Sequence, residues 1–416
     1  MTDIFSKERS NFVVKAILIL TLAPAAAYAY TVFHYALNIP HWDDYDAVLD
    51  FMNHFKTSTS LSSKILLLFS QQNEHRILFT KCFFALYYAL FHILNFQNAI
   101  LFNIVLILMV FTILSYFIKK ALPESWPFAV LIMSICLFDL NGYENADFAM
   151  AGLQNYGIIL LFVGSMFFYS KDKKIFLSFA CLLQAICVYS SGNGNLASFC
   201  LVLFVLFRSY RPAKITAIIT FLITAPLYFV GYNRVNQAFT LQPSKFVPYF
   251  LHTIAGHFGL NGGIIIGVSM LIALLILSPH LKGKKFNEDR LPLLFITVFI
   301  LGSCGIISIF RGAFPIDSAV SSRYMVYPNI LVGIIFTLLL LKIFQHKTRM
   351  IVSFAFIVSL GFVYFRNYHP GDKGFQGFYN LMKNNKYNYP DTNRAKALTD
   401  ESCRLGIYCI EKERPH

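Results

Sequence analysis

The feature that most constrains this chain is a series of apolar runs that recurs along most of its length. They occupy residues 12–37, 77–94, 98–118, 127–139, 155–169, 175–189, 196–207, 215–232, 258–279, 291–310, 325–343 and 350–365. About 20 apolar residues cross a bilayer core as a helix. Only 13% of the residues are charged, whereas a soluble domain carries about 25%. The sequence therefore predicts an all-α, polytopic membrane helix bundle with about 11–12 transmembrane helices.

The basic residues lie largely in short clusters between these runs, at 119–120, 171–174, 208–214, 282–290 and 342–349. Short basic loops stay on the cytoplasmic side of a membrane. The formal net charge of +14 thus indicates how the chain is oriented in the membrane. We expect the protein to be surrounded by membrane lipid and not to bind nucleic acid.

The expected organisation is one membrane domain, residues 1–365, with an external loop at about 38–76, followed by a polar tail at 366–416 on the same external side. One conflict remains between that loop and the cytoplasmic pair Lys119 and Lys120. The two runs 77–94 and 98–118 lie between them, where an odd number of crossings is needed. Either one run does not cross the membrane, or the Lys pair is an exception to the charge rule.

Two of the eight cysteines, Cys403 and Cys409, lie in the polar tail. They can form a local disulfide if the tail is outside the cytoplasm, or remain two free thiols. The other six lie within apolar segments, where a thiol behaves as a small hydrophobe.

Polar residues gather in five clusters, which lie at 41–46, 71–81, 141–156, 190–195 and 311–324. The expected topology places all five on one side of the membrane. Because lipid offers no hydrogen bonds, polar groups near it usually line a cavity or a water-facing mouth. This convergence predicts a binding site at that face.

The first cluster contains two adjacent carboxylates, Asp43 and Asp44, next to Trp42. Crowded carboxylates raise each other's pKa, which suits a general base. Their oxygens are also suitable ligands for a divalent cation such as Mg²⁺. An acidic loop that is merely solvated is the alternative interpretation.

The other four clusters supply candidate substrate-binding groups. Basic side chains can neutralise a phosphate. Anchoring of a helix end is the alternative for Arg76 and Lys81, and it fits Lys81 better. Pairing with Asp317 is the alternative for Arg311 and Arg323. Amides and acids suit hydroxyl-rich ligands such as sugars. A Gly-interrupted turn between two short apolar runs, 190–195, is a further pointer to a binding site. The full set of candidates is Trp42, Glu74, His75, Arg76, Lys81, Glu144, Asn145, Gln154, Asn193, Arg311, Arg323 and Tyr324.

The order of these motifs resembles that of the GT-C superfamily of membrane glycosyltransferases. In that family the first external loop carries the catalytic acidic residue, and Trp42-Asp43-Asp44 stands in that place. The chain is also similar to the serotype-converting O-antigen glucosyltransferases. It combines Asn-Glu-His-Arg at 73–76, Glu-Asn at 144–145 followed by Gln154, a Ser/Gly/Asn turn at 190–195 and Ser-Arg-Tyr at 322–324. The resemblance covers about residues 12–343 and leaves the tail unexplained.

This resemblance implies an inverting glycosyltransferase in the bacterial inner membrane, with its active site facing the periplasm. The donor would be undecaprenyl-phosphate-sugar, with glucose expected, and the acceptor a glycan or lipid-linked glycan such as O-antigen. Asp44 or Asp43 would act as the base. Arg76 and Arg323, with Lys81 and Arg311 behind them, would stabilise the departing phosphate. No cofactor is required by the resemblance, and members of the family differ in their need for Mg²⁺ or Mn²⁺.

Two other functions fit a membrane helix bundle. A transporter or flippase of a lipid-linked sugar would place charges on both sides of the bilayer midplane, whereas the clusters here lie at one face. A polysaccharide polymerase would carry long, Arg-rich external loops, whereas Arg76 is the only arginine in the loop at 38–76.

Overall fold

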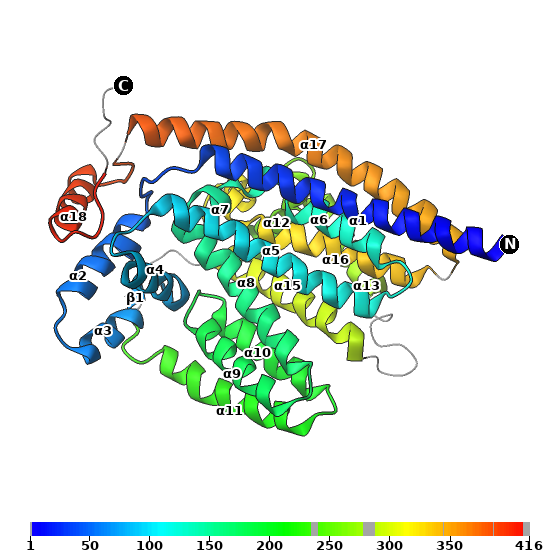
Figure 1. Cartoon of the computed structure of the whole chain (residues 1–416), viewed down its shortest axis with the longest axis horizontal. Helices are drawn as coiled ribbons and strands as arrows, with labels where there is room; N and C mark the ends of the chain where they lie inside the picture. The colour runs from blue at the N-terminus through cyan, green and yellow to red at the C-terminus, as the bar shows by residue number, and fades with distance from the viewer. Residues whose placement is uncertain (1, 234–239, 278–287, 344, 386, 411–416) are drawn as a thin grey trace.

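The computed structural model describes residues 2–233, 240–277, 288–343, 345–385 and 387–410, so the basic residues Lys282 to Lys285 lie outside the described part. The described chain is an all-α bundle with one short β-hairpin (Figure 1). The helices that follow the apolar runs are α1 (Thr2–Tyr35), α4 (Leu78–Phe91), α5 (Phe96–Ala121), α6 (Trp126–Leu137), α8 (Ala149–Tyr169), α9 (Lys174–Val188), α10 (Gly194–Leu206), α11 (Arg211–Tyr228), α13 (Gly263–Leu277), α15 (Leu291–Arg311), α16 (Val326–Lys342) and α17 (His346–Asn384).

Six helices of the described chain are long and apolar enough to cross a membrane by length and composition, and five further apolar helices are shorter. The prediction of an all-α helical membrane protein is therefore confirmed at this level. The connecting elements are η1 (Tyr45–Asp50), α2 (Phe51–Thr57), α3 (Leu61–Leu68), η2 (Leu140–Gly142), α7 (Tyr143–Asp147), α12 (Pro243–Ile254), η3 (Gly256–Phe258), η4 (Glu288–Arg290), η5 (Ile316–Val320), η6 (Ser322–Tyr324) and α18 (Thr392–Arg404).

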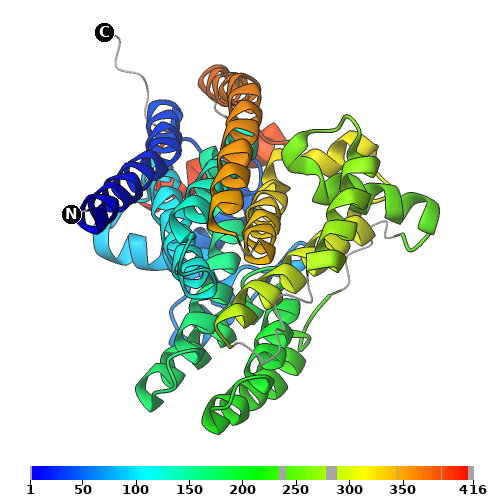
Figure 2. The same cartoon turned by 90° about the vertical axis from the view of Figure 1, so that its right-hand side faces the viewer.

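The helices divide into an enclosed set and a peripheral set (Figures 1 and 2). The spans formed by α6 with α7 and by α8 are largely buried, whereas the spans of α1 and α17 are largely exposed. The exposed positions on α17 include Phe354, Phe362 and Phe365. Large apolar side chains on an outer helix face are what a surrounding bilayer requires.

Ion pairs join the loops that the charge pattern assigns to the cytoplasm. Arg208 Nη2 lies 2.9 Å from Asp172, and its Nη1 lies 3.3 Å from Glu288. Arg349 likewise pairs with Glu124 at 2.8 Å. Loops that a single membrane face must share are thus in contact in the folded chain, as the alternation of apolar runs requires.

Helix α4 removes the conflict in the crossing number. It has 14 residues, a length of about 21 Å against a hydrocarbon core of about 30 Å. Its first amide, of Leu78, donates to the Tyr189 carbonyl, and the Leu94 amide just beyond its end donates to Ile407. Both partners lie at the end of the bundle that carries the polar clusters, where Figure 1 also shows α2, α3 and α18. Helix α4 therefore begins and ends at this same end of the bundle, and α5 alone runs from that end to Lys119.

The tail begins later than hydropathy suggested, because α17 continues through Asn384. Beyond it, α18 packs against η1 and α2, and a disulfide joins Cys403 to Cys409. The tail is thus part of the folded bundle rather than a detached extension. Of the two alternatives for Cys403 and Cys409, the structure has the disulfide.

Candidate functional site

The loop after α1 gives its two adjacent acids different surroundings. Asp44 is buried, and its two carboxylate oxygens accept the backbone N–H groups of His41 at 3.0 Å and Met150 at 3.1 Å. Burial raises the pKa of this carboxyl well above its usual range, and the two amide bonds oppose that rise. Asp44 therefore ties the loop to the start of α8 through both oxygens, in a buried position.

Asp43 is partly exposed, and the charged side chains around it, Arg323 and Glu74 among them, act on its carboxyl electrostatically. Its partial burial raises the pKa of the carboxyl, while the positive charge of Arg323 and the ring of His75 lower it. A carboxylate with a raised pKa is a better proton acceptor. Of the two acids predicted as base, Asp43 is the one in a position to accept a proton.

The C-terminal tail holds the segment around these acids. The Trp42 amide donates to the Asn388 carbonyl at 3.1 Å, and the Asn388 side chain lies 2.9 Å from the His41 ring. Arg394 binds Asp46 through Nε at 2.9 Å and Nη2 at 2.7 Å. The backbone at Trp42 has a positive φ of 44°, which is uncommon for a bulky side chain. The hydrogen bonds with Asn388 and Arg394 thus hold the segment around Trp42 in this backbone conformation.

Arg76 and Lys81 do not face a substrate space. A short hairpin, β1 (Gln71–Gln72) with β2 (His75–Arg76), precedes α4. Arg76 donates to the carbonyls of Phe69, Tyr228 and Val230, and Lys81 donates to those of Leu67 and Ser70. Their predicted contact with phosphate has no geometric support, because both cations are already bound to the protein backbone.

His75 and Gln154 form a polar pair although 79 residues separate them. The Gln154 side-chain amide lies 2.9 Å from Nε2 of His75 and 3.3 Å from the Ser191 hydroxyl. Burial lowers the pKa of His75, whereas Glu74 and Asp43 raise it. The hairpin, α8 and the 190–195 turn are thereby joined in one hydrogen-bonded wall.

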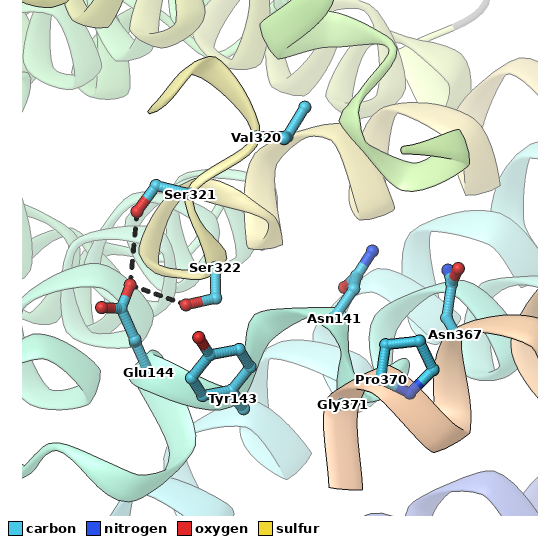
Figure 3. A pocket seen from close by; sticks show the side chains of 9 residues that line it. All are labelled: Asn141, Tyr143, Glu144, Val320, Ser321, Ser322, Asn367, Pro370 and Gly371. Atoms are coloured by element: carbon cyan, nitrogen blue, oxygen red, sulfur yellow. Dashed lines mark hydrogen bonds between the residues drawn. The ribbon is translucent and has the colours of Figure 1, made fainter. Parts of the chain in front are cut away.

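Glu144 fixes the segment that carries Arg323 (Figure 3). Its Oε2 accepts the Ser322 hydroxyl at 2.6 Å and the Arg323 amide at 3.1 Å, and its Oε1 lies 3.4 Å from the Arg323 guanidinium. Asn145 donates to the Arg323 carbonyl at 2.7 Å, and Asn155 donates to Asn145 at 2.7 Å. The cluster after α6 therefore positions the Ser-Arg-Tyr motif rather than facing a ligand with all of its groups. The predicted pairing partner Asp317 is exposed.

Asn193 lies in the turn between α9 and α10 and reaches the helices behind it. Its amide donates to Ser303 at 2.9 Å and to the Tyr327 hydroxyl at 3.0 Å. The side-chain oxygens of Asn193 and Asn195 are buried, and in the described part of the chain they accept no hydrogen bond. Two buried acceptors without a hydrogen-bond partner are uncommon in a folded protein.

A cavity of about 330 Å³ collects these groups. Its polar wall comprises Glu74, His75, Gln154, Asn155, Ser191, Gly192, Asn193, Asn195, Ser303, Arg311, Tyr324 and Tyr327. Its apolar wall, from α11 and α15 and the residues next to them, comprises Tyr228, Phe229, Tyr232, Ile306, Ile307 and Phe310. The cavity is thus amphipathic, and Arg311 is the permanently charged cation among the described residues that line it.

Four of the five predicted clusters contribute to this cavity, and the fifth contains Asp43, on which the lining residues His75 and Glu74 act electrostatically. The other predicted site residues lie outside the lining: Trp42, which is half-exposed, Asp44, Arg76, Lys81, Glu144, Asn145 and Arg323. The apolar wall was missed because its residues lie in uniform apolar runs, in which hydropathy marks no position as special. The tail contacts were missed because nothing in the local pattern of 388–394 indicates a partner more than 340 residues away.

The structure gives no direct support for a metal centre. Among the described residues, no group of three or more His, Cys, Asp and Glu side chains is arranged to hold a metal ion. No protein-family model and no curated protein matches the chain in sequence comparisons.

Proposed function

We propose that this chain is an inverting glycosyltransferase of the bacterial inner membrane. It transfers a sugar, with glucose expected, from a polyprenyl-phosphate carrier to a glycan acceptor at the external face. The observation that carries this proposal is the amphipathic cavity, in which a wall of amides, hydroxyls and Arg311 faces a wall of aromatic and aliphatic side chains. A lipid-linked sugar has the same division between polar and apolar parts.

The donor fits this division group by group. The first isoprene units contact the apolar wall around Phe229 and Phe310. The phosphate lies near Arg311, whose ion pair with Glu74 is long, at 3.8 Å, and partly exposed. Such a pair contributes little stability, so the guanidinium is free to exchange its partner. The sugar hydroxyls lie against the polar wall, which includes Gln154, Asn155 and Ser191.

The reaction needs one proton acceptor and a stabilised leaving group. The acceptor hydroxyl oxygen attacks the anomeric carbon as its proton passes to the Asp43 carboxylate. The bond from that carbon to the phosphate oxygen breaks with inversion, and polyprenyl phosphate leaves with the electron pair. Arg311, with the nearby charge of Arg323, stabilises the negative charge that develops. General-base catalysis of this kind contributes about 10²–10⁴ in rate.

The test is sugar transfer in membranes that contain the full chain. Polyprenyl-phosphate-glucose is supplied with O-antigen oligosaccharide, and radiolabelled glucose is followed into the glycan. We expect transfer that requires the lipid-linked donor and falls about 100-fold or more in Asp43→Asn. Asp317→Asn, an exposed acid at a matched substitution, serves as the control and retains full activity.

Two outcomes would count against the proposal. An active Asp43→Asn variant would remove the assigned base. Movement of intact donor across sealed vesicles without transfer would instead favour the flippase alternative.

A further inference from the structure

A second cavity, of about 310 Å³, lies beside the Glu144 carboxylate (Figure 3). Three segments that are distant in sequence line it: the link between α6 and α8, the short helices η5 and η6, and the middle of α17. The polar groups that they contribute belong to Asn141, Tyr143, Glu144, Ser321, Ser322 and Asn367.

Its chemistry differs from that of the first cavity. Amides, hydroxyls and one carboxylate line it, and the described residues of its wall include no Lys or Arg. An anionic phosphate therefore has no partner here, whereas an uncharged ligand with many hydroxyl groups finds both donors and acceptors.

The cavity is built by a close approach of α17 to the α6–α8 link. A Cβ atom at Gly371 would lie 2.5 Å from Cβ of Leu140, and one at Gly374 would lie 2.7 Å from the Tyr143 ring. Only glycine allows the helix to come this near. The Tyr143 ring consequently packs on the helix backbone, and Figure 3 shows its hydroxyl directed toward Ser322 and Glu144.

The amides of this cavity are held in place by the protein. Asn141 exchanges hydrogen bonds with Asn329, at 2.9 and 3.3 Å. Asn367 donates to Asp139 at 2.9 Å and to the His257 carbonyl at 3.1 Å. In the described part of the chain, by contrast, the Tyr143 hydroxyl has no hydrogen-bond partner. Fixed amides beside a free hydroxyl form a site that needs little reordering on binding.

The two cavities are neighbours along η6, because Ser322 lines the second cavity and Tyr324 lines the first. Glu144 lines the second cavity and binds Arg323, whose charge in turn acts on Asp43. From these observations we propose that the second cavity binds the acceptor glycan, through a neutral sugar unit next to the attacking hydroxyl. This assignment rests on the proposed function, because it takes the first cavity as the donor site.

The first test separates the two substrates kinetically. Tyr143→Phe removes one hydroxyl and keeps the ring packing, and Asn367→Ala removes one amide. We expect each to raise the acceptor KM about tenfold, the value of one or two hydrogen bonds, with the donor KM unchanged. Asn384→Ala, at an exposed position of the same helix, is the matched control. A donor KM that rises as much as the acceptor KM in both variants would overturn the assignment.

The second test measures binding without turnover. Saturation-transfer NMR on the full chain in detergent uses methyl glycosides of glucose, galactose and rhamnose as probes. We expect signals from at least one probe in the wild type and in Asn384→Ala, and a marked loss in Tyr143→Phe. Absence of probe binding to the wild type, or equal binding to Tyr143→Phe, would overturn the assignment. Probe binding that follows these variants in a chain without donor-dependent transfer would refute the proposed function alone, and leave a neutral-sugar site.

Discussion

The contrast between the two adjacent acids leads to a specific prediction for Asp44→Asn. The Asp44 carboxylate accepts two buried backbone N–H groups, one through each oxygen. Asparagine has one oxygen, so its amide nitrogen would face either the His41 or the Met150 donor. One buried N–H without an acceptor costs about 1–3 kcal/mol, and we expect the free energy of unfolding to fall by that amount.

The assay follows thermal unfolding of the purified full chain in detergent, together with glucose transfer per folded molecule. Asp44→Asn should unfold at a lower temperature, whereas Asp43→Asn should unfold like the wild type and lose transfer. Asp44→Ala leaves both amides unpaired and should be less stable than Asp44→Asn. The reasoning would be refuted if Asp44→Asn unfolded like the wild type and lost transfer as completely as Asp43→Asn.

Three further predictions concern charge, packing and the tail. Arg323→Gln removes a positive charge that lowers the pKa of Asp43, so Asp43 should ionise at higher pH. The acid limb of the pH profile of kcat/KM should therefore move to higher pH, and an unmoved limb would contradict this. Gly152→Ala places a methyl group against the Asn103 side chain and the Asn145 carbonyl and should cost about 1–3 kcal/mol of stability; thermal unfolding is compared with that of Gly361→Ala, where a Cβ atom meets nothing within 4 Å. Arg394→Ala breaks a half-exposed ion pair with Asp46 in the loop after α1 and should cost about 0.5–1 kcal/mol of stability; a thermal unfolding midpoint equal to that of the wild type would contradict this.

Much of the fold follows from hydropathy. The apolar runs predict where most helices lie, because a chain in lipid must satisfy its backbone hydrogen bonds within each segment. The exceptions have physical causes. α17 continues through polar residues to Asn384 because it packs on α1 and on the α6–α8 link. α4 is apolar enough to suggest a crossing, but it is short and both its ends bind the same end of the bundle.

The five polar clusters were visible in the sequence because polar groups are costly beside lipid and therefore stand out against apolar runs. Their residue types do not distinguish a side chain that faces a ligand from one that binds the protein. Arg76 and Arg311 have the same chemistry, yet carbonyl groups occupy the first, and the second lines the cavity. Such a difference depends on which distant segments supply hydrogen-bond partners.

The sequence by itself determined the membrane class, the helix positions and the five places where polar groups gather, since these follow from local hydropathy and charge. Tertiary structure decided which of two neighbouring acids is buried against backbone amides and which faces Arg323. It also placed the tail on the loop after α1 and formed two cavities, which Ser322 and Tyr324 of η6 line in turn. These features depend on contacts between segments hundreds of residues apart, which no local pattern encodes.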